Sequence, residues 1–478
     1  MTHANLIAGS WQASNDVVPN INPSDTRDVI GEYARASAAE TDSAIAAARQ
    51  AFPAWAASTP QQRADLLDQV GSEILTRRAE LADLLSREEG KILPEAQGEV
   101  TRAGHIFKYF AGEAVRGAGQ ILSSVRPGIG VEVTREPVGV VGLVTPWNFP
   151  MAIPAWKIAP ALAYGNCVVF KPAELVPGCA WALIDIIARA GAPAGVINLV
   201  MGRGSVVGEA IVHSAQVDAV SFTGSVATGQ NILEAAAGRG AKVQLEMGGK
   251  NPLVVLDDAD LEGAVRVALD GGYFSTGQRC TASSRLIVQQ GIHDRFVEGL
   301  TQALHRQVID DARKKGTTIG PVVDPQQLKQ DLDYIRIGQS EGAHLVTGGQ
   351  ILERSAPGHY LAPALFTETR PDQRINQEEI FGPVASVTRV ASYEEALAIT
   401  NATPFGLCAG ICSTSLKYTR HFQRHAQVGM VMVNLPTAGV DYHVPFGGRK
   451  KSSYGPREQG AAAIEFYTVS KTTYIRAG

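Results

Sequence analysis

The feature that most constrains the fold is a repeated alternation between short β-branched runs and helical segments. The first set of these runs covers residues 138–144, 167–170, 196–200, 219–222 and 253–256. Such an order is typical of βαβ units, in which a helix connects two parallel strands. A second alternating region extends from residue 285 to about residue 434, with runs at 285–288, 345–347 and 428–434. The sequence therefore predicts an α/β protein with two mostly parallel sheets.

The length agrees with more than one domain. At 478 residues, the chain exceeds the size at which a single hydrophobic core usually keeps growing. Residues 40–118 precede the first alternation and have helical periodicity, so we expect them to form packed helices. No internal repeat or low-complexity linker separates the two α/β regions, and the boundary near residue 248 is placed from motifs.

Charge and hydropathy argue against several classes of partner. The formal net charge is −4, with acidic and basic residues mixed along the chain, so no broad basic surface for nucleic acid is expected. We interpret the short basic run at 449–451 as a solvated turn. No stretch approaches the roughly 20 apolar residues that span a bilayer, and the first residues do not resemble a secretory signal. We expect a cytoplasmic protein without nucleic-acid or membrane partners.

The cysteines do not form a metal or disulfide pattern. The chain has five, an odd number, and no Cys-x-x-Cys pair, so we expect neither a zinc site nor a disulfide framework. Cys408 and Cys412 lie in an apolar run and are expected to be small core residues.

Two glycine-rich segments are similar to nucleotide-binding loops without matching them. Gly202-Arg-Gly204-Ser-Val-Val-Gly208 is one residue too long for a dinucleotide fingerprint. Gly224-Ser225-Val-Ala-Thr-Gly229 has the outer spacing of a phosphate loop, but Gln230 and Asn231 follow where Lys and Ser or Thr are needed, which excludes an ATPase. The helix that follows can still offer free N–H groups to a pyrophosphate. Alternatively, Gly224 only allows the chain to enter that helix.

A lysine and a carboxylate follow another predicted strand. Lys171 and Glu174 lie in Phe170-Lys-Pro-Ala-Glu174, at the carboxyl edge where open α/β sheets bind ligands. Glu174 can accept hydrogen bonds from both ribose hydroxyls of a dinucleotide. Its charge would repel a 2′-phosphate, which favours NAD over NADP. The alternative is an ordinary surface Lys–Glu pair.

Three distant segments carry groups that suit nucleophilic catalysis. Cys280 lies in a turn of small residues before the strand at 285, Glu246 ends a predicted strand, and Asn148 follows the strand at 138–144. A thiolate can attack a carbonyl carbon, a carboxylate can act as a base, and an amide can donate to a developing oxyanion. Taken singly, Cys280 is also compatible with an inert buried cysteine, and Asn148 with a helix cap.

Taken together, these segments resemble the ordered motifs of the aldehyde dehydrogenase family. The matching motifs are Pro146-Trp-Asn-Phe-Pro150, Phe170-Lys-Pro-Ala-Glu174, Phe222-Thr-Gly-Ser225, Leu245-Glu-Met-Gly-Gly-Lys250, Gly277-Gln-Arg-Cys280, Glu379-Ile-Phe-Gly-Pro383 and Pro445-Phe-Gly-Gly448. The resemblance runs nearly end to end. It implies a Rossmann-type NAD(P)-binding domain at 1–118 and 138–247, and an α/β catalytic domain at 248–447. Residues 119–137 and 448–478 would form a small β oligomerisation arm and the C-terminal tail.

The resemblance also implies a role for each site residue. Cys280 would be the nucleophile, Glu246 the general base, and Asn148 with the Cys280 N–H the oxyanion hole. Lys157 matches a lysine often placed behind the base on a proton path. Many family members complete that path with a glutamate in the C-terminal tail, whereas this chain reads Tyr467-Thr-Val469-Ser-Lys471.

The implied cofactor is NAD, with NADP as an alternative. The resemblance places Lys171 and Glu174 at the adenosine ribose, Gly224 and Ser225 at the pyrophosphate, and Glu379 at the nicotinamide ribose with Phe381 beside it. The complete set of expected cofactor residues is Thr145, Trp147, Lys171, Glu174, Gly204, Gly224, Ser225, Gly229, Met247, Glu379 and Phe381. A homodimer or homotetramer is implied as well.

The substrate is less clearly encoded. Residues 277–284, 438–448 and 452–459 most resemble the α-ketoglutaric semialdehyde dehydrogenases. Arg279 can pair with a substrate carboxylate, and Phe149 is expected beside the substrate. Alternatively, Arg279 is turned outward or bound within its own domain. We therefore expect α-ketoglutaric semialdehyde as substrate, with succinic or another ω-semialdehyde as the alternative.

Two other functional classes are less favoured. A CoA-acylating relative usually lacks the base found here as Glu246. A non-catalytic binding protein would have no reason to keep Cys280, Glu246 and Asn148 together.

Overall fold

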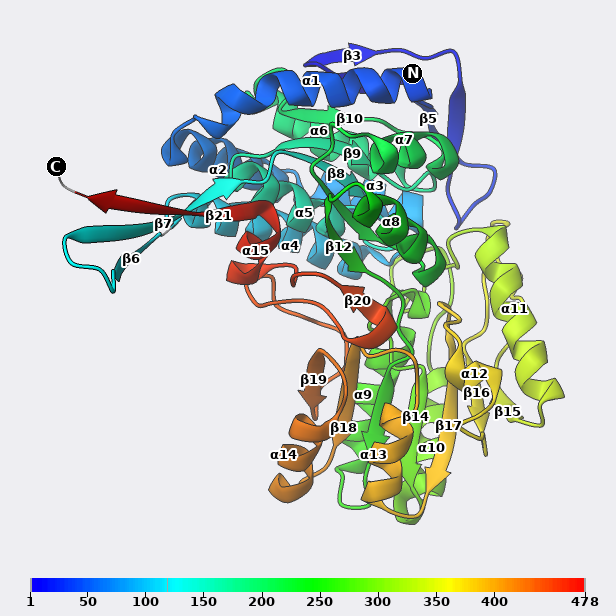
Figure 1. The fold of residues 1–478 in the computed structure, drawn as a ribbon. Coiled ribbons are helices and arrows are strands. Elements are labelled where there is room, and N and C mark those ends of the chain that lie inside the picture. Colours follow the sequence, from blue (N-terminus) through cyan, green and yellow to red (C-terminus); the bar gives the residue numbers. More distant parts are fainter. Residues whose placement is uncertain (1, 118, 477–478) are drawn as a thin grey trace.

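Two large sheets organise the computed structural model, which describes residues 2–117 and 119–476 (Figure 1). The first sheet has eight strands in the order β20-β12-β11-β8-β9-β10-β2-β3. Its central strands run parallel, as predicted, and its edges pair antiparallel. The strands are β2 (Asn5–Ile7), β3 (Ser10–Gln12), β8 (Val140–Val144), β9 (Cys167–Lys171), β10 (Ile197–Leu199), β11 (Ala219–Thr223), β12 (Lys242–Glu246) and β20 (Ser453–Tyr454).

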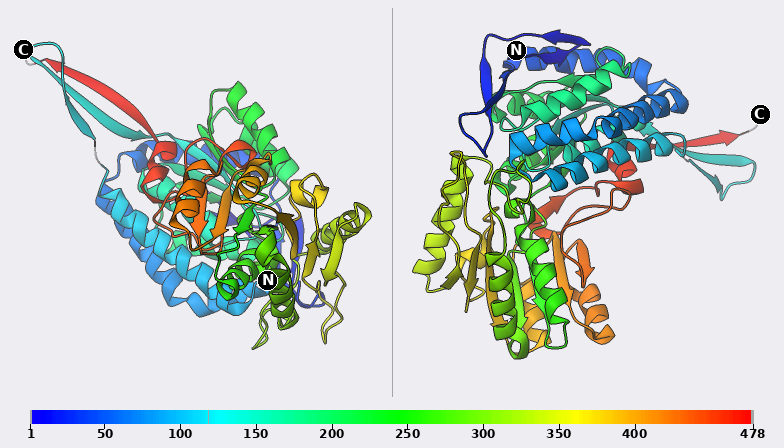
Figure 2. Two further views of the ribbon diagram at one scale, coloured as in Figure 1. Left: turned by 90° about the horizontal axis from the view of Figure 1, so that it is seen from below. Right: turned by 180° about the vertical axis from the view of Figure 1, so that it is seen from behind.

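Helices cover both faces of this sheet (Figures 1 and 2). They are α1 (Ala38–Ala56), α2 (Pro60–Thr76), α3 (Arg78–Glu89), α4 (Leu93–Ala114), α5 (Ala152–Ala163), α6 (Pro177–Arg189), α7 (Glu209–His213) and α8 (Val226–Gly238). The predicted helical region at 40–118 is confirmed by α1 to α4, and residue 118 lies outside the described residues. Capping boxes begin α1 at Ser37 and α2 at Thr59, because each cap is followed three residues later by Glu or Gln.

The second sheet has seven strands in the order β15-β16-β17-β14-β13-β18-β19. All neighbours are parallel except β15 and β16. The strands are β13 (Pro252–Val255), β14 (Arg285–Gln289), β15 (His344–Thr347), β16 (Ala364–Thr367), β17 (Val384–Val390), β18 (Cys408–Cys412) and β19 (Met430–Val433). The helices are α9 (Leu261–Tyr273), α10 (Gln290–His305), α11 (Pro325–Ser340), α12 (Arg374–Gln377), α13 (Tyr393–Asn401) and α14 (Leu416–His425). The α/β class is thus confirmed.

A narrow three-stranded arm projects from the first sheet (Figures 1 and 2). It pairs β6 (Gln120–Ser123), β7 (Ile129–Pro137) and β21 (Thr468–Arg476) in antiparallel order. A further small sheet joins β1 (Thr2–His3), β5 (Val29–Ala34) and β4 (Val17–Ile21) beside the N-terminus. Among the described residues, no helix is long and apolar enough to cross a bilayer.

The C-terminal tail is divided differently from the prediction. Only β21 enters the arm, whereas β20 pairs with β12 at the edge of the first sheet. Phe466 and Tyr467, at the end of the short helix α15 (Ile464–Tyr467), are buried in the core of the first domain. Residues 448–467 therefore complete the first domain, because two buried aromatic rings fix them there. The boundary near residue 248 stays a prediction, which the change of sheet between β12 and β13 supports.

Candidate active site

The strand order of the first sheet changes direction at β8. The loops that follow the strands on the two sides of β8 lie at the carboxyl edge of the sheet. β9 and β10 lie on one side of β8, whereas β11 and β12 lie on the other. Open α/β sheets bind ligands at such a reversal, because the loops that leave neighbouring strands diverge there. Most candidate residues of the first domain end or follow β8, β9, β11 and β12, and Gly204 follows β10. The fold therefore gathers them at one edge.

Cys280 lies in a tight turn of the second domain. Helix α9 is followed by a 3₁₀ turn (Phe274–Gly277) in which Ser275 and Thr276 have positive φ angles of 48° and 57°. Gly277 has a φ of 68°, and a Cβ there would lie 2.3 Å from the Gly382 carbonyl oxygen. Only glycine fits that approach. The turn leaves Cys280 partly accessible just before β14, as the sequence predicts.

Asn148 reaches this turn from the first domain. Its buried side chain donates a 2.9 Å hydrogen bond from Nδ2 to the carbonyl oxygen of Gln278. The alternative that Asn148 only caps the next helix is wrong, because Met151 is the N-cap of α5 and no side chain bonds there. The structure thus brings the amide beside the turn that carries the thiol, which supports its predicted role as oxyanion donor.

Glu246 is the last residue of β12, and its carboxyl group is buried. Its Oε2 accepts a 2.6 Å hydrogen bond from Ser453 Oγ in β20. Burial raises the pKa of the Glu246 carboxyl well above its usual range, and the nearby Glu458 raises it further. A carboxyl group with a raised pKa can exchange a proton near neutral pH, which suits a general base.

The thiol of Cys280 is also affected by its surroundings. Burial raises the pKa of Cys280 to about 12, and the carboxylates of Glu379 and Glu246 contribute in the same direction. Arg279 opposes them. In the free protein, the sulfur is therefore mostly protonated at neutral pH.

The predicted adenosine site lies after β9. Lys171 is buried and donates a 2.9 Å hydrogen bond to the Pro172 carbonyl, so the surface-pair alternative is wrong. Burial lowers the pKa of Lys171 to about 8, against the effect of Glu174. Among the described residues, Glu174 accepts no hydrogen bond, and its ion-pair partner is Arg35, with Nη2 at 3.8 Å. Its oxygens therefore remain available to ribose hydroxyls.

The predicted pyrophosphate site lies at the N-terminus of α8. Ser225 caps the helix by accepting a 3.3 Å hydrogen bond from the Thr228 amide. A Cβ on Gly224 would lie 2.4 Å from the Phe222 ring, so packing alone already demands glycine there. Both interpretations of Gly224 stay open, and the exposed helix end suits an anion.

Four other predicted cofactor residues have distinct surroundings. Gly229 packs on Met247, where an added Cβ would lie 2.4 Å from the sulfur atom. The buried Thr145 donates its N–H to the Lys171 carbonyl at 3.2 Å, which joins the ends of β8 and β9. Gly204 begins an exposed π-helical turn (Gly204–Gly208), and a Cβ there would meet no atom within 4 Å. The structure thus shows no close packing that would demand glycine at 204.

The predicted nicotinamide end brings residues of both domains together. Glu379 Oε1 accepts a 2.7 Å hydrogen bond from the Gly249 amide, and a Cβ on Gly248 would lie 2.2 Å from Oε2. Burial raises the pKa of Glu379 to about 7. The Phe381 ring stands edge-on to Trp147, with centroids 5.3 Å apart. Among the described residues, no side chain or amide donates to Glu379 Oε2, so a ribose hydroxyl can bind there.

A cavity of about 270 Å³ lies beside Cys280, between the domains. Its walls come from α4, α5, the nucleophile turn and the segment at 438–446. The lining residues are Lys91, Glu95, Gly98, Glu99, Arg102, Phe149, Ala152, Ile153, Trp156, Phe274, Ser275, Arg279, Cys280, Thr281, Ala438, Gly439, Val440 and Phe446. The structure therefore brings the predicted substrate residues Phe149 and Arg279 together at one cavity with the nucleophile.

Comparison with known proteins decides the family. The model of the aldehyde dehydrogenase family matches residues 11–473. The chain belongs to the aldehyde dehydrogenase family. The matched segment includes the second sheet, nearly all of the first sheet and nearly all of the arm, so the family resemblance inferred from the motifs is confirmed.

Individual relatives are similar over their whole length. The α-ketoglutaric semialdehyde dehydrogenase of Bacillus subtilis (strain 168) is 45% identical over 480 residues, covering 99% of this chain and 98% of its own. The α-ketoglutarate semialdehyde dehydrogenase of Haloferax volcanii is 40% identical, with 98% of each chain covered. Betaine aldehyde dehydrogenase from Staphylococcus aureus, solved in complex with NAD⁺, superposes with a TM-score of 0.97 at 34% identity, covering 99% of this chain and 95% of that chain.

The tail segment around Val469 carries no glutamate, as the sequence analysis noted, but another carboxylate lies beside the candidate base. Val469 lies in the arm strand β21, paired with Glu136. Instead, the buried Glu458 forms an ion pair with Lys157, whose Nζ also donates to Ser221 Oγ at 2.7 Å. This pair lies next to Glu246, because the Glu458 charge raises the pKa of that carboxyl. Glu458, Lys157 and Ser221 therefore form a buried polar chain next to Glu246, which supports the predicted proton path.

Arg279 is bound within its own domain, which is one of the two alternatives expected for it. Its Nη2 donates to the Asp270 and Gly271 carbonyls at 2.6 and 3.2 Å, within its own domain, and its guanidinium lies over the Phe274 ring. It is not turned outward, because the side chain is buried and lines the cavity. Substrate binding by Arg279 stays a proposal.

Some functional residues escaped the sequence analysis. Lys91, Glu99 and Arg102 line the cavity beside the predicted groups. Lys91 lies just before α4, and Glu99 and Arg102 lie within it. From helical periodicity alone, a single charged residue in such a segment is predicted to lie on the solvated face. Glu458 lies within a segment quoted for the substrate resemblance, but no spacing links it to Lys157.

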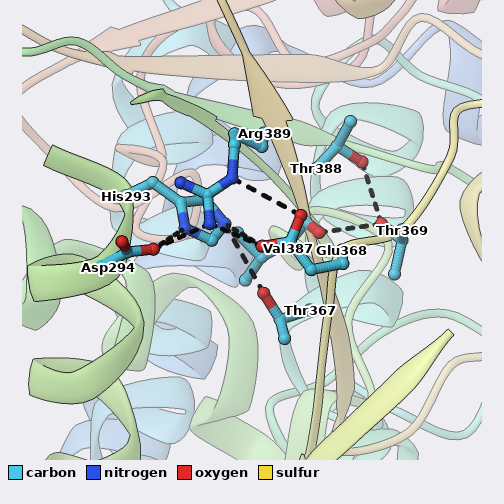
Figure 3. A network of polar contacts seen from close by, with 8 residues as sticks. All are labelled: His293, Asp294, Thr367, Glu368, Thr369, Val387, Thr388 and Arg389. Atoms are coloured by element: carbon cyan, nitrogen blue, oxygen red, sulfur yellow. Dashed lines mark hydrogen bonds and ion pairs between the residues drawn. The ribbon is translucent and has the colours of Figure 1, made fainter. Parts of the chain in front are cut away.

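One other cluster has the residue types of a metal site. His293, Asp294 and Glu368 place ligand atoms within 4.8 Å of one another (Figure 3). Figure 3 shows that the Arg389 guanidinium lies between the two carboxylates, with Nη2 2.7 Å from Asp294 and 2.6 Å from Glu368. A cation would have to displace this arginine. The cluster is therefore an ion-pair network at the end of β17.

We predict that alkylation of Cys280 in the cofactor-free protein accelerates with pH from 6 to 8.5. Because the pKa of the thiol is raised to about 12, the thiolate fraction rises about tenfold per pH unit over this range. The measurement is the rate of iodoacetamide incorporation at Cys280 by mass spectrometry, with Cys280→Ala as the blank. A plateau below pH 8 would contradict the raised pKa.

Proposed function

We propose that this protein oxidises an aldehyde to a carboxylate with NAD(P), through a thiohemiacetal on Cys280. The observation that carries the proposal is the meeting of groups from two domains around Cys280: its thiol lines the cavity, the Asn148 amide bonds to the carbonyl of Gln278 in the same turn, and the Glu246 carboxyl group is near enough to raise the pKa of the thiol. No single motif would justify it. Membership of the family and the raised pKa of Glu246 support the same conclusion.

The Cys280 thiol first releases its proton to solvent, and the thiolate sulfur then forms a bond with the carbonyl carbon. The carbonyl oxygen becomes an oxyanion, which Asn148 Nδ2 and the Cys280 N–H stabilise as donors. When bound, NAD accepts a hydride from this carbon, which leaves a thioester on Cys280.

The second step hydrolyses that thioester. Glu246 takes a proton from water as the water oxygen attacks the thioester carbon. The C–S bond then breaks, which releases the carboxylate and restores the thiol. Lys157 and Glu458 carry the proton away from Glu246, because they lie behind it as a buried ion pair.

The residues present fit NAD. Glu174 and Glu379 each leave carboxylate oxygens for ribose hydroxyls, and the capped end of α8 suits a pyrophosphate. Lys171 would assist at the adenosine ribose, and Trp147 and Phe381 would border the nicotinamide. The solved Staphylococcus aureus relative binds NAD⁺. We keep NADP as an alternative, because Arg35 beside Glu174 would partly offset the repulsion of a 2′-phosphate.

We predict different kinetic defects for two substitutions in this site. Cys280→Ala should abolish NADH formation while NAD binding is retained. Glu246→Gln should release about one NADH per active site in a burst and then turn over roughly 100-fold more slowly, because the thioester accumulates. Stopped-flow absorbance at 340 nm and NAD titration measure both. Undiminished turnover by Cys280→Ala would remove Cys280 from the mechanism.

We further propose α-ketoglutaric semialdehyde as the substrate, converted to 2-oxoglutarate. Two relatives that match this chain over 98% or more of its length carry that activity in their names. The cavity also suits an anion. Its two guanidinium groups, on Arg102 and Arg279, bind only neutral acceptors within the described residues: main-chain carbonyls and the Gln459 side chain.

Charge and shape at this cavity favour a short semialdehyde with a distant carboxylate. Burial lowers the pKa of Arg102 to about 10, so it stays charged at neutral pH. Phe149, Ile153 and Trp156 supply apolar walls for the carbon chain between the two ends. Succinic semialdehyde has the same end groups and is the second candidate.

We predict that Arg102→Met raises KM for α-ketoglutaric semialdehyde at least tenfold and leaves an uncharged aldehyde nearly unaffected, because one charge-assisted contact is lost. Arg102→Lys should restore part of the affinity, and Arg279→Met shows which guanidinium is used. Steady-state kinetics on both aldehydes provide the measurement. An equal loss for both aldehydes would indicate that Arg102 only holds the segment at 438–442.

Analysis of the reaction product tests the two less favoured functional classes, a CoA-acylating enzyme and a non-catalytic binding protein. Product analysis with and without CoA distinguishes a free acid from an acyl-CoA, and Glu246 favours the free acid. We also propose a cytoplasmic location, because the described cysteines are all free and a reducing compartment keeps them so.

A homodimer or homotetramer is proposed from the arm. Its apolar side chains are exposed on a projecting three-stranded sheet: Ile121, Leu122, Val125, Val469, Tyr474 and Ile475. An exposed apolar sheet with open edges is a typical surface for association.

We predict that wild-type protein has two or four times the 50.7 kDa mass of one chain and that Ile121→Glu with Ile475→Glu reduces this mass, because buried charge opposes association. Light scattering after gel filtration gives the mass. Val29→Glu, an exposed apolar residue outside the arm, is the matched control. A monomeric wild type would refute the oligomer.

A further inference from the structure

Lys91 is a buried cation whose contacts lead to the predicted oxyanion donor. It follows Gly90 in the link between α3 and α4, and its side chain is only 1% exposed. Its Nζ lies 2.7 Å from Glu99 Oε2 and donates to the main-chain carbonyl of Asn148 at 2.7 Å. The same ammonium lies 3.8 Å from the centre of the Phe149 ring. Lys91 thus contacts two consecutive residues of the loop after β8.

Glu99 holds the other end of the same loop. Its Oε1 accepts hydrogen bonds from the amides of Met151 and Ala152 at 2.9 and 3.1 Å. These amides begin α5, whose next turns carry Trp156 and Lys157. The Lys91–Glu99 pair therefore spans the loop from the Asn148 carbonyl to the first turn of α5.

A third buried acid, Glu89, lies beside this pair. It is 4.0 Å from Lys91 Nζ, and neither of its oxygens has a hydrogen-bond partner among the described residues. Burial raises the pKa of Glu89 well above its usual range. Burial acts to lower the pKa of Lys91, but the charges of Glu89 and Glu99 outweigh this effect and raise it, so Lys91 keeps its charge. Lys91 and Glu99 are therefore a buried, hydrogen-bonded ion pair.

The link that carries Lys91 is itself held firmly. Gly90 has a φ of 89°, and a Cβ there would lie 2.8 Å from Pro321. The Leu93 amide donates to the Ala312 carbonyl at 3.2 Å. The backbone segment that carries Lys91 is therefore packed against the second domain.

We propose that Lys91, with Glu99, is a positioning residue that fixes the Asn148 amide in the orientation needed to stabilise the oxyanion. The inference goes beyond the proposed function and rests on it only in taking Asn148 as the oxyanion donor. Asn148 is then held at both ends, by Lys91 at its carbonyl and by the Gln278 carbonyl at its Nδ2. A donor fixed before the charge develops stabilises the transition state without reorganising.

Direct binding of substrate by Lys91 is the competing explanation, since the residue lines the cavity. The ammonium has three N–H donors. Two already reach Glu99 and Asn148, and the face of Phe149 lies against the ammonium as well. Positioning is therefore favoured over contact with substrate.

A double-mutant cycle tests the proposal. The variants are Lys91→Met, Asn148→Ala and the pair of both. The measured quantity is the rate constant of NADH appearance in a single turnover, with enzyme in excess over an uncharged aldehyde. Lys91→Met should slow this step at least tenfold with KM changed less than about threefold. In the Asn148→Ala background, the same substitution should cost less than about threefold, because its target is gone.

Two further variants keep the test independent of folding. Glu99→Gln preserves the acceptor for the Met151 and Ala152 amides but removes the counter-charge of Lys91, so it should show a smaller loss that also vanishes in the Asn148→Ala background. Lys108→Met removes a surface lysine of α4 that pairs with Asp68 of α2, and this substitution should be neutral. Melting temperature and NAD affinity identify any variant that is merely misfolded.

The outcomes separate the two proposals. An equal loss in both backgrounds, or a raised KM at an unchanged rate constant, would overturn the positioning role. Absence of aldehyde oxidation by the wild type would instead refute the proposed function.

Discussion

The whole site depends on one hydrogen bond between the two α/β domains, from Asn148 Nδ2 to the Gln278 carbonyl at 2.9 Å. Asn148 follows β8 of the first sheet, whereas Gln278 lies in the turn between α9 and β14. Each partner is supported from behind: Lys91 and Glu99 hold the Asn148 loop, and Asn251 Nδ2 donates to the Cys280 carbonyl at 2.7 Å. Since a reacting carbon must touch both the sulfur and the amide, the packing of the domains sets the geometry of the chemistry.

Burial then controls the charge of the groups gathered there. Glu246, Glu379 and Cys280 all have raised pKa values, because each is removed from water, and neighbouring acids raise the pKa values of Glu246 and Cys280 further. The cations Lys91 and Lys157 are paired with Glu99 and Glu458, so they do not add free positive charge. A thiol kept protonated in the free protein is also protected, because the thiolate is the form that oxidants attack.

The sequence analysis succeeded where a residue sits at the end of a predicted strand. Glu246 ends β12, Lys171 ends β9, and Asn148 and Glu174 lie just beyond strands, so local pattern and motif were enough to select them. It failed where a residue acts through a distant partner. Glu458 is 301 residues from Lys157 and was missed, while Val469 was examined in its place. Lys91 and Arg102 belong to the link and helix around α4, where a charged residue has no distinguishing spacing.

By itself, the sequence determined the α/β class, the two sheets and the family, and it selected the candidate nucleophile, because β-strand runs, helix periodicity and strand-end motifs are local properties. Only the tertiary structure decided which charges are buried together. It also showed that β20 and the Phe466 and Tyr467 rings complete the first domain. Finally, it showed that Arg279 lines the cavity while its guanidinium is bonded to carbonyls of α9. Burial and pairing depend on chain segments that meet only after folding, and a linear pattern does not encode their distance.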